Sequence, residues 1–217
     1  MNFEEIVHRR RSTRAFLDTR VPDSLIRGLL ELSARAPSGG NVQPWKIFVI
    51  NGDAMVRFRE FLSGRDAEAA GYEIYPPSLW DPHRTARFEL GEQMYATIGI
   101  GRDDKPARFA QMAKNFDFFG APAAFFCFID TRMGPPQWSD LGMFLQTFML
   151  AAIDAGLDTC PQEAWTSYTE AVTEFVGADE QLLLFCGMAI GYEDSSQPIN
   201  SLRSERLGVS DFATFVD

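Results

Sequence analysis

The chain has 217 residues, of which 46% are hydrophobic and 23% charged, and its formal net charge is -10. This composition fits one domain, residues 1–217, with a substantial core, and the acidity argues against nucleic acid or an anionic membrane as a partner. Three well-separated cysteines without a CxxC pair, and only two histidines, argue against a disulfide framework and a metal centre. We expect no signal peptide, no membrane-spanning segment and a reducing, cytoplasmic compartment.

The first half of the chain is predicted to be mainly helical around one buried strand. Asn2 and Glu5 have the spacing of a capping box, which predicts a helix that runs into the first arginines. The segment between residues 64 and 84 is rich in proline and reads as a loop. The apolar pattern predicts further helices over residues 21–37, 54–62, 84–100 and 105–114, and a strand over 45–51.

The second half contains two further buried strands, predicted over residues 121–130 and 182–192. Between them, residues 138–155 form a long predicted helix that is apolar on most sides, which is typical of burial in a large core or against another subunit. The tail, residues 193–217, is polar but carries Phe212 and Phe215, so we expect it to dock on another surface. Continuous apolar strands between helices predict a sheet covered on both faces, in the α/β or α+β class.

The stretch RRRSTRAF, Arg9–Phe16, places four arginines within six residues of an acidic chain. Guanidinium groups bind phosphate oxygens in a bidentate manner, and Ser12 adds a hydroxyl donor. The alternative is a helix end that carries cations near its C-terminal dipole. On this stretch alone both interpretations remain open.

The stretch APSGGNVQPWKIF, Ala36–Phe48, lies between a predicted helix and a predicted strand. Gly39 and Gly40 allow the backbone to approach a ligand closely. Asn41 and Gln43 carry amides, which donate and accept hydrogen bonds as a flat heterocycle with alternating donors and acceptors requires. An ordinary helix-to-strand turn explains the same residues.

Two later stretches carry further polar residues. In GLDTCPQEAW, Cys160 is a candidate nucleophile, but no histidine is near it in sequence, so a buried and unreactive thiol is the expected reading. Glu163 is either an acid or base, or an exposed carboxylate. In NSLRSERLG, Arg203 and Arg206 are either solvated or bound to a partner.

These stretches, taken together and in this order, resemble the nitroreductase family of flavoproteins. The resemblance spans essentially the whole chain, and it rests on the order of motifs that are individually weak. The motifs are RRSTR at residues 10–14, PSGGNVQPW at 37–45, NFDFFGAP at 115–122, GLDTCPQ at 156–162 and GMAIGY at 187–192, followed by the arginine-bearing tail.

The resemblance implies an α+β fold, a three-layer sandwich in which helices flank a central, mostly antiparallel sheet. It also implies an intertwined homodimer that binds FMN at its interface, with both subunits in contact with each FMN. Ser204 stands where some family members have a second basic residue, which leaves either compensation by Arg203 or weaker phosphate binding. At the phosphate and ribityl end of FMN, the resemblance implies contacts from Arg10, Arg11, Ser12, Arg203 and Arg206.

At the ring end of FMN, the resemblance implies two catalytic groups. Arg14 would lie near the N1 and O2 edge of the flavin, and the backbone N–H of Glu163 would face N5. The remaining ring contacts would come from Pro37, Ser38, Gly39 and Asn41, which take the partner subunit's FMN, and from Pro161 and Gln162 beside Glu163.

The implied reaction passes hydride from NADH or NADPH through the flavin to an electron-poor acceptor, such as a nitroaromatic or a quinone, in a ping-pong cycle. A cation at Arg14 would stabilise negative charge on the reduced flavin. The segment of residues 64–84 matches no motif and is expected near the substrate pocket. Candidates for stacking on the acceptor, with core or interface packing as the alternative, are Trp80, Phe118, Phe119 and Trp138.

Other functions remain open at this stage. The same scaffold could act as a flavin reductase, a dehalogenase or an enone reductase, or it could bind flavin without catalysis. A structural dimerisation module is disfavoured, because clustered arginines repel one another without a partner. A Rossmann dinucleotide enzyme is disfavoured as well, since no GxGxxG follows a predicted strand.

Overall fold

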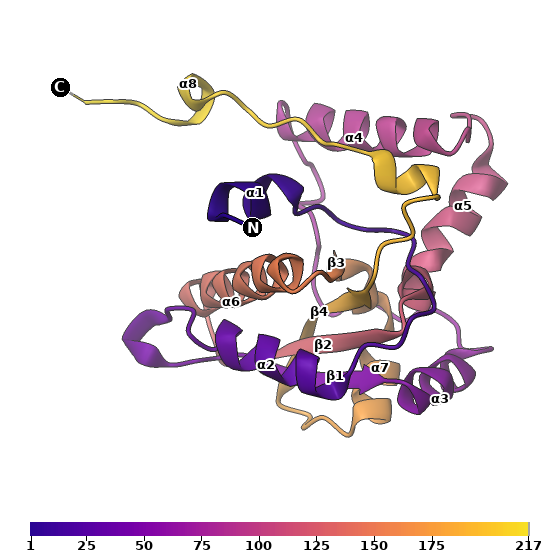
Figure 1. Ribbon diagram of the computed structural model, residues 1–217, viewed down its shortest axis with the longest axis vertical. Coiled ribbons are helices and arrows are strands. Elements are labelled where there is room, and N and C mark those ends of the chain that lie inside the picture. The colour runs from indigo at the N-terminus through magenta and orange to yellow at the C-terminus, as the bar shows by residue number, and fades with distance from the viewer. Residues whose placement is uncertain (217) are drawn as a thin grey trace.

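The computed structural model describes residues 1–216 and contains one four-stranded sheet (Figure 1). The strands follow the order β1-β2-β4-β3, and every neighbouring pair is antiparallel. The strands are β1 (Lys46–Asn51), β2 (Ala123–Asp130), β3 (Asp158–Gln162) and β4 (Leu182–Gly191). The helices are α1 (Phe3–Arg9), α2 (Asp23–Ser33), α3 (Asp53–Leu62), α4 (His83–Thr97), α5 (Lys105–Ala113), α6 (Pro135–Asp154), α7 (Thr169–Val176) and α8 (Val209–Phe212). Four 3₁₀ segments are η1 (Gly39–Asn41), η2 (Lys114–Gly120), η3 (Glu163–Tyr168) and η4 (Pro198–Ser201).

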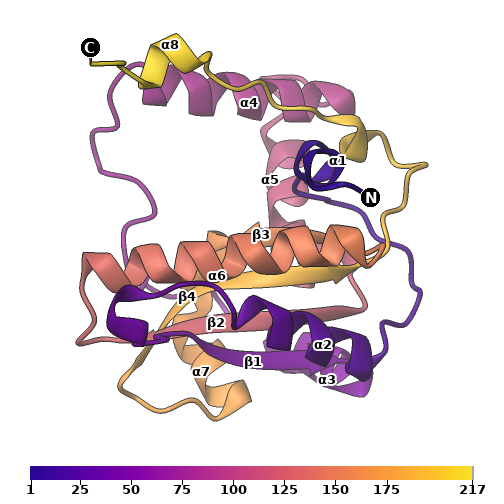
Figure 2. The same cartoon turned by 60° about the vertical axis from the view of Figure 1, so that its left-hand side comes forward.

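Strand β2 divides the core into two layers, because its side chains alternate between the faces of the sheet. Phe125 and Cys127 pack into the layer formed with α2 and α6, whereas Phe126 and Phe128 pack into the layer formed with α3 and α7. Figure 2 shows α2 and α6 on one side of the sheet and α3 and α7 on the other. The fully buried, continuously apolar strand and the expected α+β sandwich with an antiparallel sheet are therefore confirmed.

Several predicted boundaries shift, and one strand and two helices were not predicted. The long helix begins at Pro135 rather than near residue 138, and the helix expected over residues 21–37 spans only Asp23–Ser33. Strand β3 and helices α7 and α8 are additions to the predicted elements. Sequence patterning overlooks β3 because DTCPQ is short and contains a proline, which is tolerated at the edge of a sheet, where β3 lies.

Helices α4 and α5 and the C-terminal tail lie apart from the sheet (Figures 1 and 2). The segment that leads to α4 is fixed at its start, since the Glu68 carboxylate accepts hydrogen bonds from the backbone N–H groups of Glu170 and Ala171 at 2.7 and 2.9 Å. Further along, Tyr72 Oη donates to the carbonyl oxygen of Phe185 at 2.5 Å. Segment η4 packs against α4, so the tail and α4 support each other.

Phe118 and Phe119 belong to the core, which corrects the expectation that they stack on an acceptor. Their side chains are 0% and 8% exposed, within the layer that also holds Phe58 and Trp165. Both residues have left-handed backbone angles, with φ of 50° and 55°, which turn two successive aromatic side chains inward before β2. Core packing accounts for Phe118 and Phe119 of the NFDFFGAP motif without a ligand contact.

Candidate functional site

The arginines of RRRSTRAF and of the C-terminal tail meet at one cavity of about 870 Å³. The N-terminal stretch contributes Arg10, Arg11, Ser12 and Arg14, and the tail contributes Arg203, Ser204 and Arg206, although the two stretches are nearly 190 residues apart. The rest of the lining comes from α1, α4 and α6 and from Tyr75. Arginines expected from sequence to share a phosphate are therefore neighbours.

Arg10 and Arg206 are close enough to repel each other. The pKa of Arg10 is lowered, first because the side chain is partly buried and second because the Arg206 guanidinium lies nearby. Arg206 is held in place by Ser204, whose hydroxyl oxygen accepts from Arg206 Nη1 at 2.7 Å. Within residues 1–216, no carboxylate forms an ion pair with either guanidinium. The pair therefore carries positive charge that a dianion would neutralise.

Arg11, unlike Arg10, has a carboxylate partner. It forms an ion pair with Glu193, which follows β4, and both side chains are largely buried. Asp158 lies beside this pair, and its pKa is raised by burial and by the nearby Glu193 carboxylate. Because its charge is already compensated, Arg11 supports the position of its stretch more than it adds free charge to the cavity.

Asn200 joins the N-terminal stretch to the tail. This side chain is 3% exposed, its Oδ1 accepts from the backbone N–H of Arg14 at 2.8 Å, and its Nδ2 donates to the carbonyl oxygen of Ala15 at 2.8 Å. Arg203 Nη1 in turn donates to the carbonyl oxygen of Asn200 at 2.9 Å. One buried amide thus fixes both arginine-bearing stretches, and no motif in the chain indicates this role.

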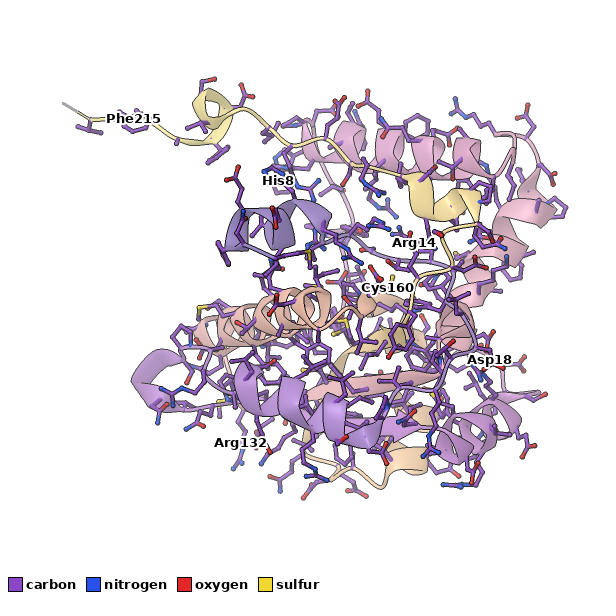
Figure 3. The ribbon with its side chains drawn as sticks, in the orientation of Figure 1. His8, Arg14, Asp18, Arg132, Cys160 and Phe215 are labelled. Carbon is purple, nitrogen blue, oxygen red and sulfur yellow. The ribbon has the colours of Figure 1, made fainter. Side chains whose placement is uncertain are left out.

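The N-terminal stretch also runs along the free edge of β3. Ser12 forms an isolated parallel bridge with Thr159, and the Thr13 N–H donates to the Thr159 carbonyl oxygen at 2.9 Å. Arg14 therefore lies next to Cys160, as Figure 3 shows. The contact brings RRRSTRAF and the GLDTCPQEAW stretch together, which was expected only from the family resemblance.

Cys160 is a buried thiol and not a poised nucleophile. Its side chain is 2% exposed, and burial raises its pKa to about 11, against the opposing effects of Arg14 and Ser12. We expect Cys160→Ala to keep acceptor reduction within about twofold of the wild type, because a thiol that stays protonated at neutral pH cannot supply a thiolate. Steady-state kinetics and the rate of thiol labelling in the folded protein measure this. A more than tenfold loss of kcat with an unchanged melting temperature would contradict it.

The Pro161–Glu163 stretch sits at the end of β3, where Gln162 pairs with Gly187 of β4. The Gln162 side chain is 2% exposed, and its Nε2 donates to the carbonyl oxygen of Asn115 at 2.8 Å, so it points into η2. Glu163 is exposed, although neighbouring protein removes enough water from its carboxylate to raise its pKa. The Gln162 side chain is therefore anchored through Nε2, whereas its Oε1 is buried and has no hydrogen-bond partner within residues 1–216.

The turn at Pro37–Asn41 is supported by α6. The Gly39 N–H donates to the buried carboxylate of Asp140 at 3.3 Å, and Gly40 has a left-handed φ of 57°. This turn does not line the arginine cavity. Gln146 of α6 does line the cavity, and it lies about 9 Å along the helix from Asp140. The structure therefore keeps this predicted group away from the arginines of its own chain.

Several residues at the site carried no signal in the sequence. Asn200, Glu193 and Asp140 act through contacts that span long stretches of chain. Tyr75 and Arg87 reach the cavity from the segment without a motif and from α4. No cluster of three potential metal ligands occurs within residues 1–216, and no helix in that range is long and apolar enough to cross a membrane.

A family model described as "Nitroreductase family" matches residues 7–192 of the chain. The chain belongs to the nitroreductase family. It is 34% identical to a 4-nitrobenzoate reductase of Pseudomonas putida, over 99% of this chain and 96% of that protein. It is 29% identical to a nitrobenzene nitroreductase of Ectopseudomonas oleovorans, over 98% and 96% of the two chains. The expected resemblance is thereby confirmed.

Solved structures of nitroreductases match the fold over its whole length. The FMN and NADPH-dependent nitroreductase NfnB from sphigopyxis sp. strain HMH superposes with a TM-score of 0.96 at 40% identity, and each chain is covered completely. The FMN-dependent NfnB from Mycobacterium smegmatis, solved in complex with NADPH, superposes with a TM-score of 0.92 at 29% identity, over 99% and 97% of the chains.

Proposed function

We propose that this protein is an FMN-dependent oxidoreductase that uses NAD(P)H to reduce nitroaromatic compounds. The observation that carries the proposal is the meeting of Arg10 and Arg206 in one cavity without a neutralising carboxylate in residues 1–216. The FMN and NADPH dependence of the solved relatives, and the nitroaromatic substrates named for the curated relatives, support the same reading.

The residues present suit the FMN phosphate. Arg10, Arg206 and Ser12 offer two guanidinium forks and a hydroxyl, which is the donor set that phosphate oxygens prefer. Arg203 lines the same cavity, while the pairing of Arg11 with Glu193 leaves it a supporting role. At the ring end we propose Arg14 and the Pro161–Glu163 backbone, because the contact with β3 brings these two groups together.

FMN, when bound, supplies the two-electron chemistry between nicotinamide and acceptor. The overall balance is one nitro group, one NAD(P)H and one proton giving one nitroso group, one NAD(P)+ and one water. Arg14 would hold negative charge at the flavin edge, and solvent would deliver the protons. We further propose a ping-pong order in one shared pocket, with quinones as a second class of acceptor.

We also propose that residues 1–217 act as a single domain within a homodimer in the cytoplasm, where NAD(P)H is available. The partner subunit would bring its Pro37–Asn41 turn to the flavin, which agrees with the separation between this turn and the arginine cavity. Exposed apolar side chains at both ends of the chain, such as Phe3, Phe212 and Phe215, support an intertwined contact. Light scattering at several protein concentrations tests the assembly.

The experiment that tests the function is an absorption spectrum of the purified protein, followed by anaerobic addition of NADH or NADPH. We expect a two-band flavin spectrum that bleaches and that recovers when a nitroaromatic compound is added. A protein that neither contains nor takes up FMN would contradict the phosphate assignment. Bound flavin that never bleaches would instead indicate a flavin-binding protein without catalysis.

A further inference from the structure

One face of α4 forms a second part of the arginine cavity. The side chains that it presents are small or apolar apart from one arginine, and their spacing places them on one side of the helix. Together with Tyr75, which precedes the helix, this face consists of Ala86, Arg87, Leu90, Gly91 and Met94. None of these positions belongs to a motif that binds the flavin.

Within the described part of the chain, Arg87 has no acidic partner, unlike the two arginines Arg84 and Arg108. Arg84 pairs with Asp81 at 2.5 Å, and Arg108 pairs with Glu92 at 2.6 Å, whereas no carboxylate in residues 1–216 forms an ion pair with Arg87. Instead, its guanidinium lies 4.3 Å from the centre of the Tyr75 ring. Stacking of this kind orients the guanidinium plane and leaves its in-plane N–H groups available.

The arrangement suits a flat aromatic molecule that carries an anionic group. Its ring would rest on the apolar side chains of α4, and its carboxylate would accept two parallel hydrogen bonds from the guanidinium fork. The named substrates of the relatives include both kinds of acceptor, since 4-nitrobenzoate is anionic whereas nitrobenzene and chloronitrobenzene are neutral. The comparisons therefore leave the charge of the acceptor open.

We propose that Arg87 is a specificity-determining residue that binds the carboxylate of the acceptor, so that the preferred substrates are nitroaromatic acids. This inference rests on the proposed function and adds the substrate class. Arg14 and Arg87 line the cavity with charges that neither Glu193 nor the FMN phosphate neutralises, and this positive field strengthens the inference because it concentrates anionic acceptors near the site.

The test compares 4-nitrobenzoate with neutral 4-nitrobenzamide in the FMN-loaded enzyme, with NADPH saturating. We expect Arg87→Ala to raise KM for the acid by roughly 10- to 100-fold, the usual effect of losing hydrogen bonds to a charged group. KM for the amide and kcat for both acceptors stay within about twofold of the wild type. Arg87→Lys, which keeps the charge but not the fork, restores part of the preference.

Arg84→Ala is the matched control. Arg84 lies one helical turn from Arg87 and carries the same charge, but it already has an acidic partner in Asp81. A second readout needs no turnover: titration of the oxidised enzyme with each compound, followed by flavin absorbance, gives dissociation constants that move as KM does. Three results would each overturn the proposal. They are equal losses of affinity for the acid and the amide, no loss for either compound, and a loss that appears with NADPH as the donor but not with NADH. Failure of the proposed function is distinct, because the wild type would then reduce neither compound.

Discussion

Replacing Arg10 with alanine is expected to weaken FMN binding by roughly 10- to 100-fold, the largest effect of any single side chain at the phosphate end. Arg10 is partly buried and lies close to Arg206, so its loss removes one of the two guanidinium groups placed for the phosphate. Fluorescence titration of the flavin-free protein with FMN measures the change. The affinity of Arg10→Lys for FMN is expected to fall between those of the wild type and Arg10→Ala, because lysine keeps the charge and loses the bidentate geometry.

Arg10→Ala should change the melting temperature differently in the presence and in the absence of FMN. In the flavin-free protein, the repulsion between Arg10 and Arg206 disappears, so the melting temperature is expected to stay the same or rise slightly. With FMN in excess, a 100-fold weaker dissociation constant removes about 2.7 kcal/mol of ligand stabilisation, which lowers Tm by roughly 5–10 °C. A purely structural role for Arg10 would lower both melting temperatures by the same amount.

Arg132→Ala is the control for charge. It removes one positive charge at an exposed ion pair with Asp130, away from the cavity (Figure 3). Exposed pairs contribute little to stability, so this variant should bind FMN as the wild type does. If Arg132→Ala weakened FMN binding as much as Arg10→Ala, the general acidity of the chain, rather than a local phosphate site, would explain the loss.

The meeting of the arginines was predicted from the family resemblance and not from any one stretch, because RRRSTRAF and NSLRSERLG, taken alone, are also explained by a helix end and by solvated charges. Arg10, Ser12 and Arg206 were expected to meet, and they line one cavity. The two buried strands were predictable from the residues themselves, since a short continuous apolar run rich in aromatic residues, such as AAFFCFID, is typical of a strand covered on both faces.

What could not be predicted depends on contacts between distant parts of the chain. Strand β3 has little strand propensity of its own and is ordered by β4 on one side and by the Ser12–Thr13 backbone on the other. Phe118 points into the core because tertiary packing imposes a backbone angle that an aromatic residue rarely adopts. Arg87 reaches the cavity because Glu68 and Tyr72 fix the segment before α4, and neither residue belongs to a motif.

Replacing Gly187 with alanine is expected to destabilise the protein by about 3 kcal/mol, the upper part of the usual range for overpacking, and to lower Tm by roughly 6–12 °C. A Cβ atom at this position would lie 2.3 Å from Cδ1 and 2.7 Å from Nε1 of Trp165. Trp165 is fully buried and packs against Phe58 and Phe126, so it has no free space into which to turn.

The Gly187→Ala substitution should also displace part of the candidate site. Gly187 pairs with Gln162, which directly precedes Glu163, so a shift of β4 displaces the backbone proposed to face the flavin. We therefore expect Gly187→Ala to lose activity even at temperatures at which it remains folded. Thermal denaturation and activity assays at a fixed low temperature separate the two effects.

A second substitution can identify the collision as the cause. The Trp165 indole nitrogen is buried and has no hydrogen-bond partner within residues 1–216, so Trp165→Ala removes both colliding atoms without breaking a hydrogen bond. The double variant should therefore be more stable than the sum of the two single effects predicts. Gly28→Ala is the matched control, because a Cβ there meets no atom within 4 Å and alanine favours the helical conformation of α2. Additive effects in the double variant would mean that strain in the β4 backbone, and not contact with Trp165, requires glycine at position 187.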